Sequence, residues 1–330
     1  MPGAGDVVVA VSTAEVNYPD ILVIEGKYQV RPPLPFSPGK AAAGVVEAVG
    51  NGVRSVKPGD RVAVQVEYGA YAEKLRAPAA NCYPLPKALS FDQGAALGLV
   101  YQTAHFALLD RARLKAGESV LVLGASGGIG TASAQLAKAL GAGQVIAGVL
   151  GSENARLALQ IGADCVVDLE IDDLRDGLRD EVRKLTDGRG VDIVIDPVGG
   201  PATEAALRCL AWRGRIVIIG FAAGSIPRIA ANYLLVKNIS AVGLQWSDYR
   251  ERDPSWVARV QDQIFALASA GQIDPYISRI MPLERYADAL SLLRDGRAQG
   301  KIILSVESSG PGPGRERETE PAHHRTEQKP

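Results

Sequence analysis

Four glycines in one short phrase are the first indication of chemistry in this chain. Gly124, Gly127, Gly128 and Gly130 stand between the aliphatic run "SVLVL" and the helix-like stretch "TASAQLAKALGA". Glycines at this spacing permit a tight turn, a close approach of a backbone N–H group to a pyrophosphate, and close packing of the helix on the strand. The helix N-terminus offers unpaired N–H groups to the phosphates. The phrase predicts a dinucleotide site, the alternative being a turn that needs glycine for steric reasons only.

The end of the next aliphatic run indicates which dinucleotide is bound. An NAD site places an acidic residue there for the ribose hydroxyls, whereas a 2′-phosphate requires hydroxyl and cationic donors. The run ends at Leu150 and is followed by Ser152 and Arg156, with no acid at the tip. Glu153 competes, but a glutamate in the first turn of a helix more often complements the helix dipole. We therefore expect NADPH, unless Arg156 is only a solvated surface residue.

Cysteine and histidine are too scattered for a metal centre. Cys82, Cys165 and Cys209 are far apart, and the histidines are His105 and two residues near the C-terminus. A zinc site requires three or four converging ligands, so we expect no metal and interpret the cysteines as small core residues. His105 lies among apolar neighbours, which favours a buried, hydrogen-bonded helix histidine over a catalytic one.

The elements that would position the glycine phrase show a clear alternation. Aliphatic runs, apolar on both faces, alternate with helix-like stretches, which is typical of a doubly wound parallel sheet with helices on both faces. The runs are "SVLVLG" (119–124), "QVIAGV" (144–149), "CVVD" (165–168), "VDIVID" (191–196), "RIVIIG" (215–220) and "ISAVGL" (239–244).

The remaining segments differ in character. Residues 1–92 are β-like and rich in turns, and residues 245–307 end in a strand-like "GKIILSV" that could return to the first region. We predict that residues 1–92 and 245–307 form one β-rich domain and that residues 93–244 form the dinucleotide-binding domain. Residues 308–330 are rich in Pro, Gly and charge, and we expect them to be a disordered tail.

Composition excludes several classes of partner. The 330 residues include 36 Lys and Arg against 37 Asp and Glu. The net charge is therefore too small to attract nucleic acid or an anionic membrane surface over a long range. No apolar run approaches the length of a membrane span, and the N-terminus has no signal-peptide pattern. We expect a cytoplasmic protein with a small-molecule substrate.

Several phrases occur in an order that marks a family. They are "VNYPDILVIEGKYQ" (16–29), "PPLPFSPGKAAAGVVEAVGNGV" (32–53), "KPGDRV" (57–62), "GAYAE" (69–73), "TAHFAL" (103–108), "GASGGIG" (124–130), "DPVGG" (196–200), "IGFAAG" (219–224) and "GKIIL" (300–304). The chain resembles zinc-independent medium-chain dehydrogenases/reductases of the NADPH:quinone oxidoreductase type. This resemblance implies an α/β enzyme with two lobes: a β-rich, GroES-like catalytic domain and a Rossmann cofactor domain, with the nicotinamide in the cleft between them.

The resemblance also implies roles for particular residues. Asn17 and Tyr28 match positions that line the substrate side. For the cofactor, it implies Thr103 near the nicotinamide carboxamide, Gly127, Gly128 and Ile129 at the pyrophosphate, Ser152 and Arg156 at the 2′-phosphate, and Val198, Gly199 and Phe221 along the adenosine and nicotinamide paths. The edge strand "NISAVGL" pairs with its twin in that family, so a homodimer is expected.

Departures from the family pattern keep alternatives open. Ala41 replaces a usual acidic residue, "PGKAAAG" lacks the histidine of the zinc-dependent relatives, and Leu22 and Leu169 replace tyrosines. The expected reaction is hydride transfer to a quinone or another carbonyl-conjugated acceptor, with Tyr28 and Asn17 as hydrogen-bond donors to the developing oxyanion. A 2-enoyl thioester reductase and a non-catalytic NADPH-binding protein are the alternatives.

Two further features have alternative interpretations. The phrase "LQWSDY" (244–249) is either a pocket wall for a flat substrate or packing at a domain junction. The chain starts close to the family's second strand, which suggests either a truncated start or an open sheet edge.

Overall fold

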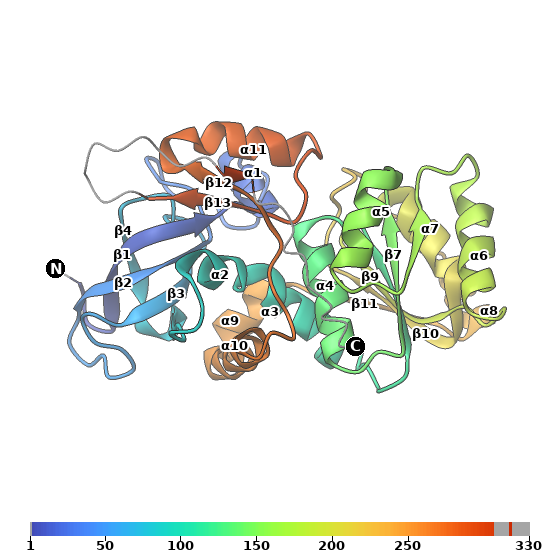
Figure 1. Ribbon diagram of the computed structural model, residues 1–330, viewed down its shortest axis with the longest axis horizontal. Coiled ribbons are helices and arrows are strands. Elements are labelled where there is room, and N and C mark those ends of the chain that lie inside the picture. The colour runs from blue at the N-terminus through green and yellow to red at the C-terminus, as the bar shows by residue number, and fades with distance from the viewer. Residues whose placement is uncertain (1, 307–316, 319–330) are drawn as a thin grey trace, which may run out of the picture.

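Two β-sheets organise the computed structural model, which describes residues 2–306 and 317–318 (Figure 1). Within these residues the first sheet has eight strands in the order β14-β12-β13-β1-β2-β3-β5, and β4 pairs with β1. Its strands are β1 (Asp6–Glu15), β2 (Ala41–Val49), β3 (Arg61–Gln65), β4 (Lys74–Pro78), β5 (Cys82–Pro84), β12 (Ile277–Pro282), β13 (Lys301–Ser305) and β14 (Arg317–Glu318).

Strand β1 is the centre of this sheet. Its valines alternate inward, with Val7, Val9 and Val11 buried in a core that also receives side chains from α1 (Tyr18–Ile24) and α11 (Tyr286–Arg294). One edge of β1 pairs with β2, and the other pairs with β4 and then with β13. The return of "GKIIL" to the first region is therefore confirmed, and β1 leaves no open edge of the kind that invites edge-to-edge association.

The second sheet confirms the doubly wound α/β fold. Within the described residues it has six strands, all parallel, in the order β11-β10-β9-β6-β7-β8. They are β6 (Ser119–Leu123), β7 (Gln144–Val149), β8 (Cys165–Asp168), β9 (Val191–Asp196), β10 (Leu210–Ile218) and β11 (Ser240–Gly243). Strand β10 starts earlier than the run "RIVIIG" predicts, because Leu210 already pairs with Val191, ahead of a register shift between Leu210 and Arg215.

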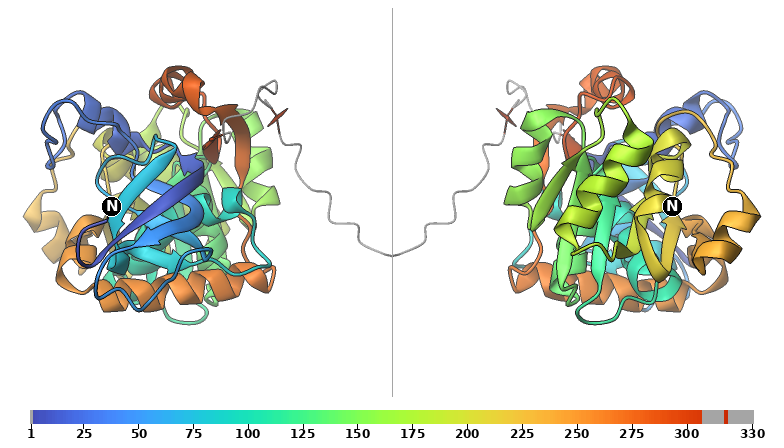
Figure 2. Two further views of the ribbon diagram at one scale, coloured as in Figure 1. Left: turned by 90° about the vertical axis from the view of Figure 1, so that its left-hand side faces the viewer. Right: turned by 90° about the vertical axis from the view of Figure 1, so that its right-hand side faces the viewer.

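Helices cover both faces of this parallel sheet, as the right-hand view of Figure 2 shows. Val120 and Val122 of β6 enter the core that contains α4 (Gly128–Ala139), whereas Leu121 enters the core on the opposite face. That opposite core receives α6 (Leu174–Leu185) and α7 (Gly200–Cys209). Ligands of such sheets bind beyond the carboxyl ends of the strands, which is where the glycine phrase lies.

The short helices α2 (Phe91–Ala96) and α3 (Leu99–His105) follow each other at the junction between the two sheets, where α2 packs on the first sheet and α3 lies beside α4 (Figure 1). The chain reaches the junction a second time after β11, through α9 and α10. The remaining helices are α5 (Gly151–Gln160), α8 (Ala231–Lys237), α9 (Trp246–Arg252) and α10 (Pro254–Ser269).

Only a small part of the predicted tail, residues 308–330, belongs to the described residues. Within the predicted tail, β14 forms a short antiparallel pairing with β12, and the rest of 308–330 lies outside the described residues. Among the helices that the structure describes, none combines the length and apolar character needed to cross a bilayer.

Candidate functional site

The glycine turn after β6 has the geometry that a phosphate requires. Helix α4 begins at Gly128, and its N-cap residue Gly127 has no side chain to cap the helix. A Cβ on Gly130 would lie 2.1 Å from the Gly124 carbonyl oxygen, so this glycine is needed for helix–strand contact. A Cβ on Gly127 would meet only that same oxygen, at 3.5 Å, and otherwise open space. The open helix start therefore fits the pyrophosphate of a dinucleotide.

The predicted cofactor residues that follow β9 and β10 lie against the glycine turn. Asp196 accepts hydrogen bonds from the N–H groups of Val198 and Gly199, both at 2.9 Å. A Cβ on Gly124 would lie 3.0 Å from Val198 Cγ2, and one on Gly199 would lie 2.9 Å from Phe221 Cδ1. The structure thus brings Val198, Gly199 and Phe221 together beside the glycine turn.

The predicted 2′-phosphate residues lie at the exposed start of α5. Ser152 and Arg156 are both exposed. The sequence analysis missed two carboxylates at the same turn: Asp168 Oδ1 lies 3.5 Å from the Gly151 N–H nitrogen, and Glu170 Oε2 lies 3.7 Å from a Cβ built on Gly151. The signal was available in "CVVD", because carboxyl ends of neighbouring parallel strands meet at one edge of a sheet.

Asn17 belongs to a buried ionic network. Its side-chain Nδ2 donates to Glu15 at 2.8 Å, and its Oδ1 accepts from Lys301 at 2.8 Å. Lys301 also forms an ion pair with Glu15 at 2.7 Å, and both side chains are almost completely buried. Burial raises the pKa of Glu15, and Lys301 opposes this shift. Because both ends of the Asn17 amide have partners inside the protein, the geometry favours a positioning role over direct contact with an acceptor.

Lys301 also connects the first sheet to the glycine turn. A Cβ on Gly128 would lie 2.9 Å from Lys301 Cδ, and the preceding Gly300 donates its N–H to the Ser126 carbonyl at 2.7 Å. The motif "GKIIL" was not expected to contribute a functional lysine. A lysine that opens an aliphatic strand is the signal, since such a side chain is rarely buried without a charged partner.

Tyr28 lies beside a second ionic cluster, which we call the Lys40 cluster: Lys40, Glu67 and Arg250. Glu67 forms ion pairs with both cations, and the Lys40 ammonium lies 4.4 Å from the centroid of the Tyr28 ring. Burial alone would raise the pKa of Glu67, but Lys40 and Arg250 outweigh it and hold that pKa below its ordinary value. Burial raises the pKa of the half-buried Tyr28, which keeps its hydroxyl protonated as a hydrogen-bond donor.

Helix α3, which carries Thr103, contacts the chain that returns to the junction at Trp246. Thr103 is buried in α3, where its hydroxyl donates to the Leu99 carbonyl at 2.7 Å. The adjacent Gln102 accepts from the Trp246 indole N–H at 2.9 Å. His105, two residues further, is buried and lies 3.0 Å from Gln263 Oε1, which confirms the interpretation as a hydrogen-bonded helix histidine.

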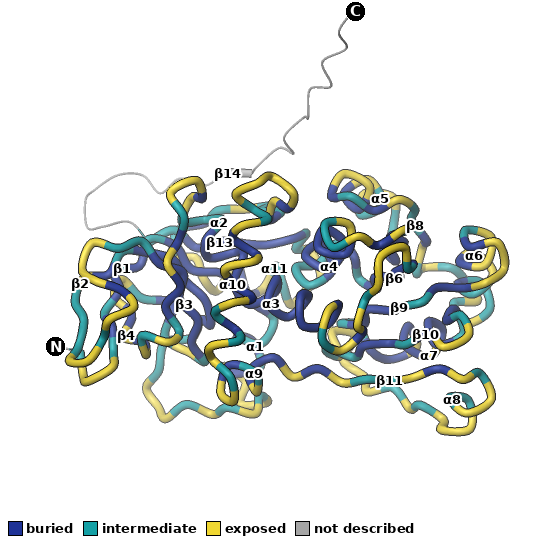
Figure 3. Tube along the Cα trace, turned by 90° about the horizontal axis from the view of Figure 1, so that it is seen from below, coloured by how far each residue is buried: buried dark blue, intermediate teal, exposed yellow. Residues whose placement is uncertain are grey.

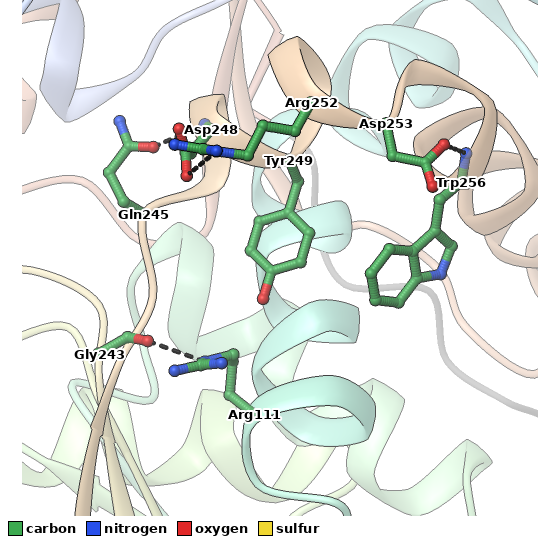
Figure 4. A pocket seen from close by; sticks show the side chains of 8 residues that line it. All are labelled: Arg111, Gly243, Gln245, Asp248, Tyr249, Arg252, Asp253 and Trp256. Carbon is green, nitrogen blue, oxygen red and sulfur yellow. Dashed lines mark hydrogen bonds and ion pairs between the residues drawn. The ribbon is translucent and has the colours of Figure 1, made fainter.

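Of the two interpretations of the aromatic phrase 244–249, packing at a domain junction is the one that the contacts support. Trp246 is buried at the junction, as described. Tyr249 stacks on Phe106, with 4.3 Å between ring centroids, and borders a surface hollow of about 350 Å³ shown in Figure 4. None of the residues predicted for catalysis or cofactor binding lines that hollow. Its lining residues are Arg111, Gly243, Gln245, Asp248, Tyr249, Arg252, Asp253 and Trp256.

Comparison with known proteins agrees with this architecture. Residues 3–87 match the alcohol dehydrogenase GroES-like domain, and residues 128–262 match the zinc-binding dehydrogenase family. The quinone oxidoreductase-like protein 2 homolog of Nematostella vectensis is 38% identical over 306 residues, which are 92% of this chain and 82% of that protein. The chain belongs to the quinone oxidoreductase-like medium-chain dehydrogenases/reductases.

Two further relatives show the range of this family. The crystal structure of Escherichia coli quinone oxidoreductase complexed with NADPH superposes with a TM-score of 0.84 at 30% identity, covering 92% of each chain. The human synaptic vesicle membrane protein VAT-1 homolog is 32% identical over 331 residues, covering 96% of this chain and 81% of that protein. The present medium-chain dehydrogenase/reductase is accordingly an oxidoreductase with GroES-like and Rossmann-type domains.

The name of one matched family raises the question of zinc. Zinc sites in proteins use three or more converging Cys, His or carboxylate side chains. Within residues 2–306 no such group is assembled, and burial raises the pKa of Cys82 and of Cys209 to about 12, which disfavours the thiolate form that binds metal. The described side chains do not fit a zinc ion, and no step of the chemistry below passes through one.

Asp20 makes the stability of this region depend on pH. Its Oδ2 accepts from the Asn17 N–H at 2.8 Å and from the Tyr71 hydroxyl at 2.9 Å. Burial raises the pKa of Asp20 from 3.8 to about 7, against the effect of these bonds. Between about pH 4 and pH 7 the folded protein therefore holds a proton that the unfolded chain has released, and the free energy of unfolding should fall as pH rises, by up to about 1.4 kcal/mol per pH unit from this group.

Urea unfolding at about pH 5 and about pH 7 checks this prediction. The Asp20→Asn variant retains an oxygen that can accept both hydrogen bonds, and its free energy of unfolding should decline less between the two pH values than that of the wild type. Asp172→Asn, at an exposed position, should preserve the wild-type decline. An undiminished decline in Asp20→Asn would show that the Asp20 carboxyl is ionised in the folded protein.

Proposed function

We propose that the protein uses NADPH to reduce a quinone or another carbonyl-conjugated acceptor without a metal ion. The observation that carries this proposal is the convergence of the open glycine turn, the Val198–Phe221 wall and the Lys301 network at the junction of the two lobes. The cofactor would supply the hydride. The residues at the turn would hold its pyrophosphate, and Thr103 would lie near its carboxamide.

The protein's own contribution is binding and orientation. Asn17 and Lys301 would position the end of β1 against the glycine turn. Tyr28, whose raised pKa keeps the hydroxyl protonated, would donate a hydrogen bond to the acceptor oxygen as negative charge develops there. An acceptor conjugated to a carbonyl suits this arrangement because its oxygen receives the electron pair displaced by the hydride.

Turnover in the presence of a chelator tests the proposal. NADPH and NADH oxidation would be followed with a small quinone and with a short 2-enoyl thioester in parallel. NADPH oxidation with the quinone alone supports the proposal, and oxidation with the thioester alone moves the activity to acyl thioester reduction. Tight NADPH binding without turnover of either acceptor supports a non-catalytic role.

Arg156 is the residue on which the NADPH preference depends most directly. Arg156→Ala should weaken NADPH binding by about 1.5 to 3 kcal/mol, the contribution of a hydrogen bond to a charged group, and should leave NADH binding almost unchanged. Fluorescence titration of each reduced cofactor measures both constants, and Arg189→Ala, at an exposed position far along the chain, is the matched control. Equal losses for both cofactors would remove Arg156 from the phosphate site. A wild-type preference for NADH would instead indicate that Asp168 and Glu170 bind the ribose hydroxyls.

The outer strand of the parallel sheet supports a homodimer. Figure 3 shows β11 and α8 together at the margin of the molecule. Nearby apolar side chains are strongly exposed: Trp212 by 72%, Leu235 by 76% and Val236 by 73%. We propose that β11 pairs with β11 of a second copy, which would cover these side chains. Light scattering during gel filtration should then give twice the chain mass of 34.8 kDa.

A cytoplasmic location is proposed on composition alone and would be tested by fractionation of the source cells.

A further inference from the structure

The Lys40 cluster contains more positive charge than it neutralises. Lys40 and Arg250 are two cations that share one carboxylate, Glu67. The buried Asp20 carboxyl also interacts with Lys40, but burial raises its pKa to about 7, so below neutral pH it is largely uncharged. The Lys40 side chain is 1% exposed, the Arg250 side chain is 6% exposed and the Glu67 side chain is 14% exposed. Taking an unbalanced charge out of water is costly, so protein interiors rarely retain one without a use for it.

The backbone places this charge at the sheet end that carries Asn17. Lys40 immediately precedes β2, whose first residue, Ala41, pairs with Glu15 on one side and Gln65 on the other. The Lys40 carbonyl accepts the Val66 N–H at 2.8 Å, which brings the residue before Glu67 alongside. Lys40 and Glu67 therefore lie at the same end of strands β1 to β3 as Asn17.

The opposite side of the cluster is fixed to the helix of Thr103. The Arg250 guanidinium lies 4.9 Å from the centroid of the Trp246 ring, and the Trp246 indole is hydrogen-bonded to Gln102, the neighbour of Thr103. The Lys40 cluster thus lies between the end of the first sheet and the helix proposed to contact the nicotinamide.

Donor groups in the cluster are left over. The Nη1 atom of Arg250 is buried and has no hydrogen-bond partner among the described residues. The Lys40 ammonium has three N–H donors, and within the described chain Glu67 is the acceptor that the structure assigns to it. Buried donors are nearly always paired in proteins, so unpaired ones mark the place of a missing acceptor.

We propose that Lys40 is a catalytic residue that stabilises negative charge on the oxygen of the hydride acceptor, with Glu67 and Arg250 as its positioning residues. This inference rests on the proposed function. Hydride adds to the carbon conjugated to the carbonyl and forms a C–H bond, and the displaced π-electron pair moves to the conjugated oxygen, which becomes an enolate oxygen. With a quinone this enolate is a tautomer of the hydroquinone anion, and transfer of one proton from that carbon to oxygen completes the aromatic product. The Lys40 ammonium pairs with the enolate oxygen, and the Tyr28 hydroxyl, or water, supplies the proton that completes the product.

This arrangement predicts a substrate class. Acceptors whose reduced form is a stabilised oxyanion, such as quinones and enones, gain from a fixed cation in a site that excludes water. Isolated aliphatic carbonyls gain less, because no conjugated system delocalises the negative charge of their reduced form.

A phenol that changes colour on ionisation tests the charge directly and without turnover. The probe is 4-nitrophenol, whose phenolate oxygen imitates the acceptor oxyanion and whose absorbance reports its protonation state. An opposite charge within contact distance lowers a pKa by about 1 to 3 units, so 4-nitrophenol bound to the wild-type protein should ionise that much more readily than in water. In Lys40→Met, of similar length and no charge, the pKa of the bound probe should return to its value in water or rise above it.

Glu67→Gln supplies a variant with the opposite expected sign. Removing the shared carboxylate leaves both cations without compensation, so the bound probe should ionise more readily than in the wild type. Lys40→Arg should retain most of the wild-type effect. Lys40→Met leaves Glu67 paired with Arg250, and melting temperature together with NADPH fluorescence verifies that each variant is folded.

The outcomes separate this inference from the proposed function. One outcome is that the pKa of bound 4-nitrophenol is lowered in the wild type and not in Lys40→Met, while the protein reduces no acceptor. That result supports the anion site and contradicts the reductase. Quinone turnover with an identical probe pKa in the wild type, Lys40→Met and Glu67→Gln overturns the inference and leaves the reductase intact. Failure of 4-nitrophenol to bind saturably to the wild type also overturns it, because an accessible cationic site for an aromatic oxyanion would then be absent.

Discussion

Lys301→Met should lower the free energy of unfolding by about 3 to 5 kcal/mol, the loss expected when one partner of a buried ion pair is removed. Glu15 has no exposed surface, and without the ammonium 2.7 Å away its charge would have no counterion. The same substitution removes the hydrogen bond to Asn17 Oδ1. Since Lys301 also lies against the glycine turn, NADPH affinity should fall together with stability. Urea unfolding and cofactor titration measure the two losses.

The double variant Lys301→Met with Glu15→Gln separates charge from packing. If the loss comes from an uncompensated carboxylate, neutralising Glu15 should recover much of the stability, because replacing a whole buried pair is far less costly than breaking it. Lys27→Met is the control, since the Lys27–Glu25 pair is exposed and such pairs contribute at most about 1 kcal/mol. A loss in Lys301→Met no greater than in Lys27→Met would contradict the role assigned to this network.

Gly130→Ala should cost at least about 3 kcal/mol, the upper end of the usual range for an overpacked interior. The added Cβ would lie 2.1 Å from the Gly124 carbonyl oxygen and 2.5 Å from Ala125 Cα. Both are backbone atoms, which cannot rotate away as a side chain can, so α4 would have to move off β6. Thermal unfolding and the yield of folded protein measure this loss.

Gly127→Ala is the matched variant in the same turn. Its φ is −83°, which alanine adopts, and its new methyl group would meet only the Gly124 oxygen at 3.5 Å. Stability should change by about 1 kcal/mol or less, as for an N-cap change from Gly to Ala, whereas NADPH binding should weaken because the methyl occupies the open side of the helix start. Equal stability losses in Gly127→Ala and Gly130→Ala would show that Gly127 is needed for packing, as Gly130 is, and not for ligand approach alone.

Local patterns in the sequence predicted the parts of this protein that depend on local physics. Each of the six aliphatic runs became a parallel strand. The central strand β6 is apolar throughout because it is buried on both faces. The glycine phrase was interpretable for the same reason: the requirement at Gly130 arises from atoms only five or six residues away. His105 could be assigned from its apolar helix neighbours alone.

The ionic networks could not be predicted from local patterns. Lys40, Glu67 and Arg250 are contributed by the first region and by α9, and Glu15 meets Lys301 across nearly the whole chain. Each residue by itself resembles an ordinary surface charge, and only the sheet order brings the charges into contact. Asp168 was missed for a different reason. It is the last residue of β8 and lies beside the end of β7 only because these two strands are neighbours in the sheet.

Strand β13 has a consequence for how the molecule is made. It pairs with β1, although the whole parallel sheet lies between them in the chain. During synthesis on a ribosome, β1 to β5 therefore emerge with the β13 side of the Thr13–Glu15 segment unpaired, while the Rossmann-type lobe can complete all its strands first. Until β13 emerges, Glu15 lacks its lysine and the β1 edge is open to other chains. The period of greatest exposure to aggregation should thus end only when residues 301–305 leave the ribosome, and a chaperone that binds nascent chains would act on the first-made lobe.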